Sequence, residues 1–122
     1  MTPSFSTSTY SPLNLFAGDF PRAAITVTIA SGEDLTAGAV LGQVTADKKF
    51  KLSLSAAGDG SEVPKAILAE DCDASGGDKE ATAYFTGDFA EDALTIGTGH
   101  TLASIRWGLV DLSIFLRKTT QA

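Results

Sequence analysis

The sequence predicts one mainly β domain, of the α+β class, with a single short helix near the carboxy terminus and a flexible arm at the amino terminus. Three observations predict this class. Several short segments alternate apolar and polar residues, glycine-marked turns separate them, and one late segment has helical spacing instead. With 122 residues, the chain is long enough for one core of modest size, in a small barrel or sandwich of strands.

Residues 24–29 have the clearest strand pattern. Ile25, Val27 and Ile29 alternate with threonines, so we expect these three side chains to share one face of the strand and the threonines to share the other. Further strands are expected at residues 40–44, 49–54, 63–69, 81–87 and, as a shorter element, 94–97.

A turn is expected at residues 58–61, between two of these strands. Its glycines allow positive φ, and the side chains of Asp59 and Ser61 can bond nearby backbone N–H groups. We expect Gly60 to have positive φ.

Apolar residues recur at helical spacing over residues 101–110, and Thr98 or Thr101 is placed to cap this helix. The apolar residues are Leu102, Ile105 and Leu109. Residues 111–116 then become extended, with three alternate residues on one face. These are Leu112, Ile114 and Leu116.

Trp107 is the only tryptophan, and it lies to one side of the helical apolar stripe. This position predicts partial exposure. An exposed tryptophan is a common anchor of protein interfaces, whereas packing at the edge of the core is the other interpretation. The sequence leaves both open.

Residues 2–12 contain no charge and are bounded by prolines. Their hydroxyl side chains compete with regular structure, and the segment has too little apolar surface to offset its ordering entropy. Phe5 and Tyr10 are nevertheless good strand formers. We therefore predict an arm, residues 1–14, that is flexible when free and can pair with the sheet edge of a partner, followed by a domain at 15–117 and a polar tail at 118–122. A frayed segment without a role is the alternative.

The formal charge of −6 argues against nucleic-acid binding, which needs clustered basic side chains. Lys48, Lys49 and Lys51 are close together, but a solvated hairpin explains them. The amino terminus has no features of a signal peptide, and no apolar run approaches the ~20 residues that cross a bilayer, so we expect a soluble protein without a membrane partner.

No set of side chains predicts a catalytic, metal or cofactor site. His100 is the only histidine, and its spacing from the acidic residues and cysteine at 71–73 matches no metal-binding motif. The aspartates beside Cys72 would raise the pKa of its thiol, so we expect a buried or unreactive cysteine. Turn formation accounts for Asp59 and Ser61.

Several segments follow one another in a recognisable order. They are Phe20, Ile29, residues 32–35, a Gly-Xaa-Val-Leu-Gly strand at 38–42, an Asp-Gly-Ser turn at 59–61, Pro-Lys-Ala-Ile-Leu-Ala-Glu-Asp at 64–71, and residues 84–89 and 108–116. In this order, over about residues 15–117, the chain resembles the head decoration proteins of lambda-like tailed bacteriophages.

The resemblance implies a structural virion protein that is not an enzyme and needs no cofactor. It would be made in the host cytoplasm and bind the major capsid protein on the outside of the expanded head. Homotrimers at threefold or quasi-threefold sites would stabilise the shell against the pressure of packaged DNA. Composition and position assign the capsid contacts to the arm, with Trp107 as a further interface candidate. The arm candidates are Phe5, Thr7, Thr9, Tyr10 and Leu13.

Two other classes of protein stay open. A small β-barrel module that binds a ligand or carbohydrate would need an exposed aromatic platform, for which Trp107 and Tyr84 are the candidates. An enzyme would be indicated by loss of turnover when His100 or Asp71 is changed.

Overall fold

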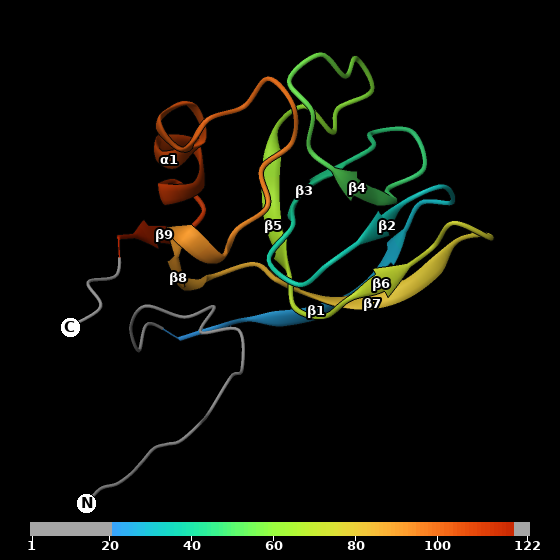
Figure 1. Cartoon of the computed structure of the whole chain (residues 1–122), viewed down its shortest axis with the longest axis horizontal. Helices are drawn as coiled ribbons and strands as arrows, with labels where there is room; N and C mark the ends of the chain where they lie inside the picture. Colours follow the sequence, from blue (N-terminus) through green and yellow to red (C-terminus); the bar gives the residue numbers. More distant parts are fainter. Residues whose placement is uncertain (1–20, 119–122) are drawn as a thin grey trace, which may run out of the picture.

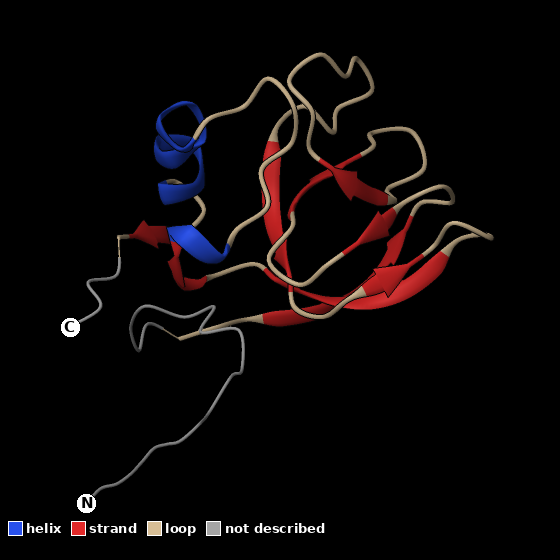
Figure 2. Cartoon of the chain, viewed as in Figure 1, coloured by secondary structure: helices blue, strands red, loops and turns tan. Residues whose placement is uncertain are grey.

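The computed structural model of the protein describes residues 21–118. This part of the chain is mainly β and carries one short α-helix near its carboxy-terminal end, as the sequence predicted (Figures 1 and 2). The predicted arm, residues 1–14, lies outside the described residues. The elements in order are β1 (Ala24–Ile29), β2 (Asp34–Leu35), β3 (Val40–Gln43), β4 (Phe50–Leu52), β5 (Pro64–Leu68), β6 (Cys72–Asp73), β7 (Lys79–Tyr84), β8 (Gly87–Ala90), the 3-10 helix η2 (Glu91–Ala93), α1 (Leu102–Val110) and β9 (Ile114–Arg117).

Five strands close into a small barrel in the order β1-β4-β3-β5-β7. β1 and β7 pair antiparallel along their whole lengths, from Ala24 opposite Tyr84 to Ile29 opposite Lys79. β1 and β4 run parallel and are paired at one position, Ile29 with Phe50. The pairing that closes the barrel on this side is therefore shorter than that between any other two neighbouring strands.

Two small sheets lie outside the barrel. β2 pairs antiparallel with β6, and β8 pairs parallel with β9. In Figure 1, β8, β9 and α1 gather at one end of the molecule, at the left, and β2 and β6 lie toward the other end.

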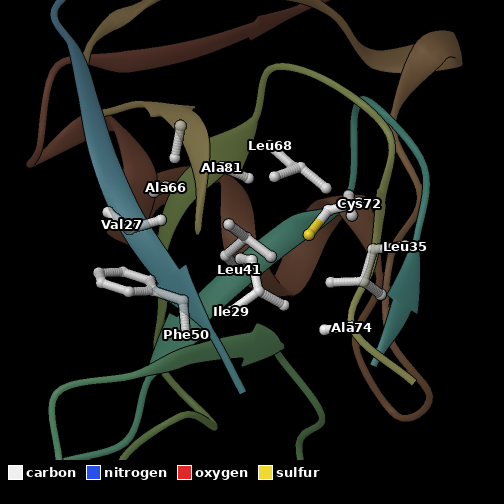
Figure 3. Packing of buried hydrophobic residues seen from close by; sticks show 12 residues of the cluster. Val27, Ile29, Leu35, Leu41, Phe50, Ala66, Leu68, Cys72, Ala74 and Ala81 are labelled. Atoms are coloured by element: carbon white, nitrogen blue, oxygen red, sulfur yellow. The ribbon is translucent and has the colours of Figure 1, made fainter. Parts of the chain in front are cut away.

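Alternation along the strands fills the barrel with apolar side chains (Figure 3). Phe50 meets the ring of Phe85 edge to face, with centroids 5.8 Å apart, which closes the core near β1. The buried members of this core are Val27, Ile29, Leu35, Ala39, Leu41, Phe50, Ala66, Leu68, Cys72, Ala74, Ala81 and Ala83.

A second apolar cluster joins α1, β8 and β9 to the outside of the barrel. On β5, Ala66 and Leu68 belong to the barrel core and Ile67 belongs to the second cluster, and all three are fully buried. A strand covered on both faces is apolar at consecutive positions, which explains this run in the sequence. Ile105 and Leu109 of α1 complete the cluster, so the helix is held by its predicted apolar face.

Ile25, Val27 and Ile29 lie on one face of β1 as predicted, but burial along that face is uneven. Val27 and Ile29 are buried, but Ile25, on the same face of β1, is 52% exposed. The reason is tertiary, because Val27 and Ile29 pack into the barrel core, whereas Ile25 lies earlier on β1 and outside that cluster.

Two predictions about the segments before and after α1 were wrong in detail. Residues 94–97 form no strand, because Thr95 makes an isolated bridge with Ala39 and the chain then crosses to Ser55, whose N–H donates to the Thr98 carbonyl. Leu112 is 40% exposed because it lies in the turn between α1 and β9, ahead of the buried alternation of that strand.

Candidate interaction surface

The five predicted arm residues lie outside the described residues. The first described residues, 21–23, lead into β1, and we call them the arm root because they follow the amino-terminal part of the chain that lies outside the described residues. The Phe85 N–H donates to the Ala23 carbonyl at 2.8 Å, so the pairing of β1 with β7 continues back into the arm root. The Thr86 hydroxyl accepts from the Ala23 N–H and donates to the Pro21 carbonyl, both at 2.9 Å. One hydroxyl thus fixes two backbone groups of the root, the Pro21 carbonyl and the Ala23 N–H.

Gly87 provides the space that Arg22 occupies. Its φ is +148°, and a Cβ atom there would lie 2.9 Å from both Arg22 Cγ and the ring of Phe89. A side chain at this position would displace either the arm root or Phe89, which is fully buried.

β8, which contacts the arm root at Gly87, pairs with the carboxy-terminal strand β9. Gly87 pairs with Ile114 of β9, and its N–H donates to the Ser113 carbonyl at 3.1 Å. Asp88 is almost fully buried, and Arg117 Nε donates to its carboxylate at 2.7 Å. Because a buried carboxylate is costly without a partner, this ion pair ties β9 firmly to β8 next to the root.

The outer face of α1 presents Trp107, which is 70% exposed. Thr101 caps the helix as predicted, in a capping box with Ser104. Ala103 and Ser104 lie one helical turn before Trp107, and Val110 and Asp111 lie one turn after it. An exposed indole on a helix that is held by its other face is the arrangement expected of an anchor that enters a pocket on a partner.

The side chain of Arg106, next to Trp107, makes its contacts within the domain. Its guanidinium donates to the Leu116 carbonyl at 2.6 Å and to Glu91 at 2.7 Å, which ties α1 to β9 and η2. α1 is thus held rigidly while its tryptophan faces solvent.

The arm root, β9 and α1 therefore form one end of the molecule (Figure 1). The family model described as bacteriophage lambda head decoration protein D matches residues 9–114. The chain belongs to this family. No curated protein was found to match the chain.

Membership gives this head decoration protein a structural role and a place on the phage capsid. Among residues 21–118, no helix combines the length and apolar character that crossing a membrane requires.

The described residues of this decoration protein contain no group of three or more His, Cys, Asp or Glu side chains suited to a metal ion. His100 Nε2 lies 3.2 Å from the hydroxyl of Ser53, which is fully buried, so the ring attaches the segment before α1 to the end of β4. Cys72 is buried as predicted, and burial, more than its acidic neighbours, raises the pKa of its thiol.

Two of the three lysines in the predicted basic cluster form ion pairs with aspartates. Lys49 pairs with Asp78, and Lys51 lies 3.3 Å from Asp59. Lys48 is exposed at the hairpin with φ +63°. The cluster therefore does not form a basic patch.

The aromatic platform that a carbohydrate-binding module would use is incomplete in the described residues. Tyr84 is half-buried, with its ring 5.8 Å from that of Phe89, and Trp107 is the one exposed aromatic side chain of residues 21–118.

Thr86, Gly87 and Arg22 were not identified from the sequence. A Thr-Gly pair after a strand has no specific signature, and its importance follows from contacts with residues more than 60 positions earlier in the chain.

Proposed function

We propose that this protein binds the outside of the expanded phage head as homotrimers at threefold and quasi-threefold positions. There it contacts the major capsid protein and stabilises the shell against the pressure of packaged DNA. The observation that carries this proposal is the family match over residues 9–114. The site of action is the outer surface of the virion, after synthesis in the host cytoplasm.

The arm is the main attachment in this proposal. Residues 2–12 add a strand to an exposed edge of the capsid protein, which provides affinity through main-chain hydrogen bonds. Phe5 and Tyr10 fill pockets, and Thr7, Thr9 and Leu13 lie along the same segment. Fully extended, eleven residues reach on the order of 36 Å, enough to cross a subunit boundary.

The fixed arm root supports this role. Thr86, Gly87 and Phe85 hold residues 21–23 by hydrogen bonds and close packing, so the chain is fixed to the folded body from residue 21 onward. Three arms per trimer bind with avidity, because each bound arm raises the effective concentration of the next.

The test is sedimentation of the protein with expanded shells that lack it. Deleting residues 2–12 is expected to weaken binding ~100-fold or more, since avidity multiplies the loss at each arm. The melting temperature is expected to stay nearly unchanged. Deletion of residues 119–122 is the matched control for a shortened terminus, and it is expected to bind as the full-length protein does.

Full-length affinity of the arm-deleted protein would contradict the arm as the attachment and would move the interface to the folded body, beginning with Trp107. Failure of the full-length protein to bind shells would contradict the proposed function itself.

A further inference from the structure

The described fold contains two apolar clusters, and only the second includes α1 and β9. All five barrel strands lie within residues 24–84, and their ring of pairings is complete without any later residue. α1 and β9 pack against the outside of that ring through the second cluster (Figure 1). We call α1, β9 and the turn between them, residues 102–117, the outer unit. Releasing the outer unit breaks the β8–β9 pairing and none of the barrel pairings.

The outer unit is held together by its own contacts. The Arg106 guanidinium donates to the Leu116 carbonyl at 2.6 Å, which links the helix to the strand. A helix of nine residues is too short to be stable by itself in water. α1 and β9 therefore keep their structure together or lose it together. The second cluster buries two side chains from each of them, namely Ile105, Leu109, Ile114 and Leu116.

Two ion pairs and one strand pairing fasten the outer unit to its neighbours η2 and β8. Arg106 donates to Glu91 of η2 at 2.7 Å, and Arg117 donates to Asp88 of β8 at 2.7 Å. Among residues 21–118, β9 pairs only with β8, whereas each barrel strand pairs with a neighbour on both sides. Opening the outer unit therefore breaks one strand pairing, and unfolding the barrel breaks all of the pairings in its ring.

The chain that leads into the outer unit is fastened to the barrel independently. The Thr95 N–H donates to the Gly38 carbonyl, and the Val40 N–H donates to the Thr95 carbonyl, both at 3.0 Å. The Ser55 N–H donates to the Thr98 carbonyl at 3.2 Å. These bonds end shortly before α1, so the preceding chain can stay attached to the barrel while the helix leaves it.

We infer that the outer unit opens and closes as one piece while the barrel stays folded. Proteins open in contiguous units of this kind, at a lower free energy than global unfolding. The closed state dominates, and the open state is a small population. Trp107 belongs to the outer unit, so the exposed tryptophan of the folded body is carried by the less stable of its two parts. The opening is a property of the domain itself and does not depend on capsid binding.

Amide hydrogen exchange of the full-length protein tests this opening without any substitution. Relative to their intrinsic rates, amides of α1 and β9 are expected to exchange at least about tenfold faster than the most protected amides of β1 and β7. The opening exposes less surface than global unfolding, so low concentrations of denaturant are expected to accelerate α1 and β9 less than the barrel. Equal protection and equal denaturant dependence in the two sets would overturn the inference.

A matched pair of substitutions separates the two parts of the domain. Ile29 lies in the barrel core and Ile114 in the second cluster, and both are fully buried. Ile29 keeps its contacts when the outer unit opens, so Ile29→Val is expected to accelerate exchange in β1 and β7 about three- to tenfold and to leave α1 and β9 unchanged. Ile114 loses its contacts in either kind of opening, so Ile114→Val is expected to accelerate both sets.

The response of α1 and β9 to Ile29→Val decides the outcome. Acceleration there as large as in β1 and β7 would mean that the described domain unfolds as one cooperative unit, and it would overturn the inference. Both variants shorten a buried side chain by one carbon and suit a strand, so both are expected to fold.

Discussion

Asp59 accepts two hydrogen bonds from Ser61, one from its hydroxyl at 2.6 Å and one from its N–H at 3.0 Å. These bonds, followed by the contribution of Lys51, lower the pKa of Asp59 to about 2. A carboxyl group in an unfolded chain has a pKa of about 3.9. Asp59 therefore stabilises the folded protein above that pH, and its contribution is lost as the pH falls to about 2.

The first residue-scale prediction follows from this sign. Asp59→Asn is expected to melt at a lower temperature than the parent protein at neutral pH, and the difference is expected to vanish near pH 2. Melting curves between pH 2 and 7 measure it. Asp92→Asn is the control, because Asp92 is exposed and has no hydrogen bond within residues 21–118. A deficit of Asp59→Asn that persisted at pH 2 would contradict the assignment.

Gly60 occupies the same turn and has φ +104°, as predicted from the sequence. A Cβ atom there would overlap the side chain of Thr45. Gly60→Val combines this overlap with a conformation that β-branched residues avoid, so we expect a loss of about 1–3 kcal/mol in the free energy of unfolding.

Denaturant unfolding tests this value against Gly58→Val, because Gly58 has open space around its Cα. The control is expected to change stability by about 0.5 kcal/mol or less. Equal midpoints for the two variants would mean that the turn tolerates a side chain at Gly60.

At the scale of elements, α1 has two faces with different tasks. Ile105 and Leu109 attach it to the second cluster, and Trp107 stands on the opposite, exposed side. Trp107→Ala removes little buried surface, so we expect stability within about 0.5 kcal/mol of the parent protein. If Trp107 anchors a partner, shell binding should fall by more than about 1 kcal/mol, or more than about fivefold.

Val63→Ala is the matched control for this change, because Val63 is also exposed, at 62%, in another part of the surface. Shell sedimentation of the two variants gives the comparison. An equal effect of both would indicate that Trp107 has no specific role in the interface.

At the scale of the whole molecule, a rigid barrel carries the arm root, β9 and α1 at one end. This arrangement suits a protein whose attachments must all face one surface. Electron cryo-microscopy of decorated shells is expected to show this protein in groups of three around threefold and quasi-threefold axes, because closed symmetric groups with three arms bind by avidity. Isolated copies or twofold pairs would contradict the trimer model.

Much of the local structure was determined by the sequence itself. The strand at β1, the Asp59–Ser61 turn and the Thr101 cap follow from alternation and from side-chain bonds to nearby backbone, which act over a few residues. The exposure of Trp107 was one of two interpretations that helical spacing allowed, and the structure decided between them. The arm candidates stay predictions.

The tertiary structure alone decided which strands are neighbours. Ile25 has the same periodicity as Val27 and Ile29, yet it is exposed, because only Val27 and Ile29 lie within the apolar core that distant strands build. The fixing of the arm root by Thr86 arises in the same way. It depends on contacts between residues distant in sequence, and periodicity specifies which face of a strand is apolar without specifying what lies beside its edge.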